Sequence, residues 1–121
     1  MARRRQRKAD VLKAPDATYA RGEHVFVLRG AMTPKTREAY RGVHSGQDLA
    51  PGAAREDAWQ RAVEFLFERL AASWSVAGTE PLTGQKQLLG RLRFASTDER
   101  RVVREVLREH LAEHFPDVQA P

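Results

Sequence analysis

Apolar residues between positions 54 and 115 recur at intervals of three and four, which is the spacing of amphipathic helices. The first stripe predicts one long helix over about residues 54–77, ended by Gly78. Its members are Trp59, Val63, Leu66, Leu70, Trp74 and Ala77. Three leucines then predict a second helix that ends near residue 94, and these are Leu88, Leu89 and Leu92.

A third helix is marked at both of its ends. Ser96 and Glu99 have the spacing of a capping box, in which both side chains accept hydrogen bonds from backbone amides at the start of a helix. Pro116 ends the segment, because proline cannot continue a helix. The stripe between them consists of Val103, Val106, Leu107, His110, Leu111 and His114. Three helices in succession predict an antiparallel three-helix bundle over about residues 54–115.

The N-terminal part of the chain is less regular. Residues 1–22 show no apolar periodicity, and we expect them to form a basic arm that is flexible when free. Residues 25–28 form a short apolar run whose pattern fits either a strand or a buried helical turn. The sequence offers no second clear strand, so this one would pair with a symmetry mate in a dimer or lie extended on the helices. Thr33 and Pro34 predict the start of a short helix that ends before Gly42.

The predicted fold class is therefore mainly α. It combines the three-helix bundle with an irregular N-terminal extension that contains one short strand or helical turn. The predicted organisation is an arm over residues 1–22 and a single helical domain over residues 23–121.

Composition excludes several classes of protein. The chain has 121 residues, of which 41% are hydrophobic and 31% charged, an ordinary mixture for one globular domain. It has no cysteine, which excludes disulfides, a thiol nucleophile and cysteine-ligated metal sites. No apolar stretch approaches the length of a membrane span, and none follows the basic N-terminus as in a secretory signal. We expect a cytoplasmic protein with no membrane partner and no cofactor.

The net charge of +5 is concentrated at the N-terminus. Residues 1–13 carry six basic side chains and one acidic one, so this segment accounts for the whole excess. Such a cluster favours contact with nucleic-acid phosphates independently of base sequence, because each bound cation releases condensed counterions. A solubilising tail without a ligand, and an acidic protein or membrane surface, are the alternatives. The predicted contacts to the nucleic-acid backbone are Arg3, Arg4, Arg5, Arg7, Lys8 and Lys13.

Two motifs on the third predicted helix invite more specific functions. His110, Glu113 and His114 have the order of an inverted zinc-peptidase motif. That chemistry needs a further ligand well downstream, whereas only seven residues follow His114. We therefore predict no metal site, no catalytic residue and no enzyme.

The same helix also has the basic character of a recognition helix in a helix-turn-helix protein. The glutamates of this helix lie along its surface next to the arginines and would repel phosphates. A solvent-exposed face that binds no nucleic acid is therefore the favoured interpretation. The arginines concerned are Arg100, Arg101, Arg104 and Arg108.

Phe65 is the candidate for a partner interface. It lies on the flank of the first predicted helix, outside the apolar stripe, whereas Trp59 and Trp74 are expected to share the core face. The predicted function is a non-enzymatic accessory protein that contacts nucleic-acid backbone through its basic arm. The alternative is a protein-interaction module, either a homodimer or a subunit of a larger complex, with a solubilising basic tail.

Overall fold

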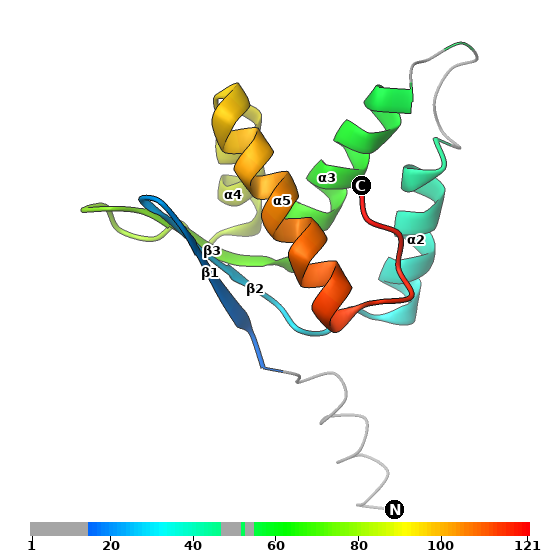
Figure 1. Ribbon diagram of the computed structural model, residues 1–121, viewed down its shortest axis with the longest axis horizontal. Coiled ribbons are helices and arrows are strands. Elements are labelled where there is room, and N and C mark those ends of the chain that lie inside the picture. Colours follow the sequence, from blue (N-terminus) through cyan, green and yellow to red (C-terminus); the bar gives the residue numbers. More distant parts are fainter. Residues whose placement is uncertain (1–14, 47–51, 53–54) are drawn as a thin grey trace, which may run out of the picture.

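The computed structural model describes residues 15–46, 52 and 55–121. These residues form three strands and four helices (Figure 1). In chain order they are β1 (Ala17–Arg21), β2 (His24–Leu28), α2 (Pro34–His44), α3 (Arg55–Leu70), β3 (Ala71–Val76), α4 (Gln85–Arg93) and α5 (Thr97–His114).

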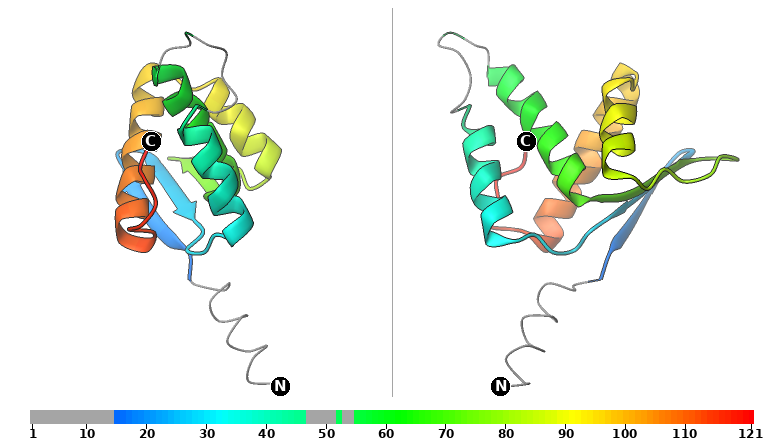
Figure 2. Two further views of the ribbon diagram at one scale, coloured as in Figure 1. Left: turned by 90° about the vertical axis from the view of Figure 1, so that its right-hand side faces the viewer. Right: turned by 180° about the vertical axis from the view of Figure 1, so that it is seen from behind.

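The three strands form one antiparallel sheet with β2 in the centre. A tight turn joins β1 to β2 at Gly22, whose φ of 56° is in the left-handed region that favours glycine. The strand register places Tyr19, Phe26 and Trp74 side by side across the sheet. All three side chains are buried against the helices, which cover one face of the sheet (Figures 1 and 2).

The predicted three-helix bundle is wrong, because the fold is a mixture of helices and sheet. The helix expected over residues 54–77 ends at Leu70, and residues 71–76 form β3 instead. Trp74, four positions after Leu70, is in phase with a helical stripe, but it is equally in phase with the alternation of a strand. Pairing with β2, which is distant in the sequence, decides between the two. Trp59 and Trp74 therefore do not share a helix face.

The N-terminal extension is also more regular than predicted. The run at residues 25–28 is a strand, as one of its two interpretations proposed, and it lies within β2. Its partners are β1 and β3 of the same chain rather than a symmetry mate. Residues 17–21, which fall within the predicted arm, form β1. The prediction of one short strand thus missed both of its neighbours.

The N-terminal starts of two helices, α2 and α5, were predicted correctly from capping chemistry. Thr33 Oγ1 accepts a hydrogen bond from the Thr36 amide at 3.1 Å at the start of α2. The capping box at the start of α5 is complete, with Ser96 Oγ bonded to the Glu99 amide at 3.1 Å and Glu99 Oε1 to the Ser96 amide at 3.0 Å. Helix α2 continues through Gly42 to His44, beyond its predicted end.

Helix α3 packs against both α2 and α4, and α5 contacts α3 and β1. A short turn at residues 94–96 joins α4 to α5, at the end of the two helices away from the sheet (Figure 2). The C-terminal residues 115–121 run back along α2 (Figure 1). Tyr40 fixes this segment by donating its hydroxyl hydrogen to the Gln119 carbonyl at 2.6 Å, and Arg37 lies 3.2 Å from Asp117.

Candidate functional site

A groove of about 440 Å³ lies where α2, α3 and α4 meet. Its apolar lining residues, called the floor here, are Val43, Phe65 and Leu89, and its other lining side chains are charged. The lining residues are Val43, Gly46, Arg61, Glu64, Phe65, Glu68, Leu89 and Arg93. This size falls within the range of sites that hold a small molecule or the side chains of a protein partner.

Phe65, the predicted partner contact, lies in this groove. Its ring is half-buried, with the Tyr40 ring centroid 6.3 Å away on one side. The guanidinium carbon of Arg69 lies 5.3 Å from the centroid of the Phe65 ring. Contacts with α2 and with the next turn of α3 thus hold the ring in place while part of it still faces the groove.

Charged side chains border this apolar floor. Arg93 Nε of α4 donates to Glu64 Oε1 of α3 at 2.7 Å, which ties the two helices together. Arg61 and Glu68 also line the groove, and neither makes an ion pair within the described part of the chain. The groove therefore combines apolar side chains with a cation, Arg61, and a carboxylate, Glu68, that form no ion pair with any other described residue.

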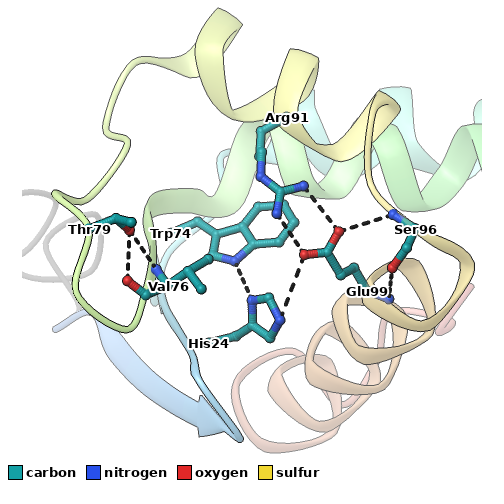
Figure 3. Close-up of polar contacts among 7 residues, drawn as sticks. All are labelled: His24, Trp74, Val76, Thr79, Arg91, Ser96 and Glu99. Carbon is teal, nitrogen blue, oxygen red and sulfur yellow. Dashed lines mark hydrogen bonds and ion pairs between the residues drawn. The ribbon is translucent and has the colours of Figure 1, made fainter.

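A polar cluster of His24, Trp74, Arg91 and Glu99 joins the sheet to α4 and α5 (Figure 3). Trp74 Nε1 donates to His24 Nδ1 at 3.1 Å, and His24 Nε2 lies 3.7 Å from Glu99 Oε2. Arg91 donates to both carboxylate oxygens of Glu99, at 2.6 and 3.2 Å, and its guanidinium lies 4.5 Å from the centroid of the Trp74 ring.

The hydrogen bonds from Arg91 and from the Ser96 amide lower the pKa of Glu99 to about 2, so it is ionised at neutral pH. Because the Trp74 N–H occupies His24 Nδ1, the hydrogen of the neutral imidazole resides on Nε2, facing Glu99. Neither nitrogen of His24 is then free to accept a proton from a substrate. The cluster connects the elements rather than supplying a general base.

His110, which belongs to the motif of two histidines and a glutamate on α5, makes hydrogen bonds within the fold. His110 is fully buried: its Nε2 donates to the Arg29 carbonyl at 2.8 Å, and its Nδ1 accepts from the Tyr19 hydroxyl at 2.8 Å. Burial lowers the pKa of His110 and raises that of Tyr19 to about 12. His110 has no free lone pair for zinc, and within the described ranges no three His, Asp or Glu side chains gather as metal ligands.

Three of the four arginines considered for a recognition helix are engaged within the molecule. Arg100 donates to the Arg93 carbonyl at 2.7 Å, and Arg101 lies 3.6 Å from Asp98. Arg104 donates to the Pro121 carbonyl at 3.2 Å and lies 5.4 Å from the centroid of the Trp59 ring. Two of these contacts, those of Arg100 and Arg104, join α5 to other parts of the fold, whereas Arg101 and Arg108 are exposed to solvent.

The predicted nucleic-acid contacts lie outside the described residues. They are Arg3, Arg4, Arg5, Arg7, Lys8 and Lys13. The sequence did single out Phe65, but not its neighbours in the groove or the cluster around Glu99. In both places the side chains come from elements far apart along the chain, so no local spacing marks them.

Comparisons with protein-family models, with curated proteins and with solved structures found no match. In the part of the chain that the structure describes, no helix combines the length and the apolar character needed to cross a membrane.

Proposed function

We propose that this protein is a non-enzymatic interaction module that binds a segment of a protein partner in the groove at Phe65. The observation that carries the proposal is a groove lined by half-buried Phe65 and by Arg61 and Glu68, which form no ion pair within the described residues. The occupant is a helical segment, including one that ends in a turn, with one large apolar side chain, an acidic residue that meets Arg61 and a basic residue that meets Glu68. A helix in a groove is a common mode of peptide recognition, and its apolar anchors supply most of the binding energy.

A selection from a phage-displayed library of helical peptides tests this proposal. On the full chain we expect enriched peptides with an apolar anchor, an acidic residue on one side and a basic residue on the other. On the Arg61→Glu variant the acidic position should become basic, since the charge of the rim has been reversed. Arg108→Glu is the matched control, because it makes the same charge change on an exposed position of α5, and it should leave the selected pattern unchanged.

A substitution in the floor provides an independent measurement. Phe65→Ala should weaken the selected peptides by about tenfold or more, as expected for an anchor contact. Because Phe65 also packs on Tyr40, circular dichroism must show that the variant is folded. A library that yields no enriched peptide, or enriched peptides that bind Phe65→Ala and Arg61→Glu like the parent chain, contradicts the proposal.

We also propose contact between the basic arm and nucleic-acid backbone, as a second function. What supports it is the distribution of charge. Residues 1–13 carry the whole net excess of +5, whereas several arginines of the described body make internal ion pairs or bond to backbone carbonyls. A cluster of cations of this density neutralises phosphates and releases their condensed counterions.

A further inference from the structure

Phe94 stands apart from every other large apolar side chain in the described residues. It is 92% exposed, at the C-cap of α4 and in the turn that leads to α5. That turn lies away from the sheet (Figure 2). An aromatic ring left almost wholly in water at such a turn has the exposure expected of an anchor for a protein partner.

The groove also involves this end of α4. Arg93, which precedes Phe94 in the chain, lines the groove together with Leu89 from the same helix. The exposed aromatic ring therefore follows directly after a lining residue of the groove. In a dimer with a twofold axis the same contact forms twice, so the exposed ring of each copy can bind in the groove of the other.

The charges beside the ring complement those in the groove. Asp98 and Arg101 follow Phe94 in the first turn and a half of α5, with side chains 88% and 66% exposed. Arg61 and Glu68 stand on the walls of the groove. A copy seated in the groove can therefore place Asp98 against Arg61 and Arg101 against Glu68, which joins opposite charges in both pairs and replaces the solvent-exposed contact of 3.6 Å between Asp98 and Arg101.

We propose that the occupant of the groove is the α4–α5 turn of a second copy, with Phe94 of each copy inserted at Phe65 of the other. This inference rests on the proposed function of the groove and names its partner. It gives the exposed ring and the unpaired rim charges one common explanation.

Sedimentation of the full chain over a range of concentrations tests the proposal. We expect a reversible dimer, and we expect Phe94→Ser to weaken dimerisation by about tenfold or more, as for an interface anchor. Because Phe94 makes little contact with its own chain, this variant should keep the unfolding curve that the parent shows at concentrations where it is monomeric. Gln87→Ser, at an exposed position of α4, is the matched control and should dimerise like the parent chain.

A charge exchange between two variants tests the arrangement itself. Arg61→Glu and Asp98→Arg should each weaken self-association. In a dimer of either variant, the two symmetry-related contacts between positions 61 and 98 join like charges. Mixed in equal amounts they should form a heterodimer, because every contact then again joins opposite charges. Two variants that remain monomeric after mixing overturn the proposed arrangement.

The outcomes separate this inference from the function on which it rests. A monomeric parent chain, or a Phe94→Ser variant that dimerises as tightly as the parent, overturns the second copy as occupant. If the second copy is overturned in this way but the groove of Phe94→Ser still enriches peptides of the expected pattern, the interaction module stands and its partner is a different protein. If that variant enriches none, the proposed function fails as well.

Discussion

Replacing Glu99 by glutamine tests whether the cluster between the sheet and the two C-terminal helices stabilises the fold by its charge. A glutamine at this position of the capping box can still accept the hydrogen bond from the Ser96 amide. The substitution therefore removes the charge that faces Arg91 and His24 while keeping the cap. Any loss of stability then reports mainly on the ionic contacts.

The expected loss follows from the acidity of the group. A fall of the pKa from 4.5 to about 2 corresponds to at most about 3 kcal/mol of stabilisation by the ionised form. The carboxylate is 22% exposed and solvent screens part of its attraction to Arg91, so we expect Glu99→Gln to cost about 1–2 kcal/mol at neutral pH.

The way in which this loss of stability changes with pH follows from the direction of the pKa shift of Glu99. The pKa of Glu99 is lower in the folded chain than in the unfolded one, so its contribution is complete above pH 4.5 and is lost as the pH falls toward 2. The difference in unfolding free energy between the parent chain and Glu99→Gln should therefore be constant near neutrality and shrink in acid. Glu105→Gln is the control, because Glu105 is exposed on the same helix and makes no ion pair among the described residues.

Urea unfolding followed by circular dichroism, at neutral pH and at several values down to about pH 3, measures both quantities. A loss no larger than that of Glu105→Gln would refute the assigned role of the charge. A loss that stays the same throughout the acid range would show that it does not arise from ionisation of this carboxylate.

Three further predictions concern the buried histidine and the arm. Tyr19→Phe leaves His110 Nδ1 without a donor and should cost about 1–2 kcal/mol in urea unfolding; an unchanged midpoint would contradict this hydrogen bond. Burial lowers the pKa of His110, so its imidazole should titrate below pH 6.5 by NMR, and its contribution to stability should decline as the pH falls below 6.5, where the unfolded chain takes up the proton first. A titration midpoint at or above 6.5 would be inconsistent with that environment. Deleting residues 2–13 should abolish binding to duplex DNA in a salt-gradient assay, and the parent's log–log salt slope should be about −0.9 for each phosphate neutralised. Equal binding with and without the arm would eliminate the second proposed function.

Those parts of the fold that depend on neighbouring residues were readable from the sequence. The caps at Thr33 and Ser96 were predicted because a capping side chain bonds to an amide only a few positions away. The stripe along α5 was predicted because helical periodicity is a local property. Phe65 was found as an apolar residue outside such a stripe, which is also a local observation.

Tertiary structure alone decided the rest. Residues 71–76 are a strand because β2 lies beside them, and their own spacing fits a helix equally well. The groove and the cluster around Glu99 exist because side chains from several elements meet in space. A helix is specified by hydrogen bonds between residues four apart, whereas a sheet or a shared site depends on contacts across long stretches of chain, and the sequence pattern at one place carries no record of its distant partner.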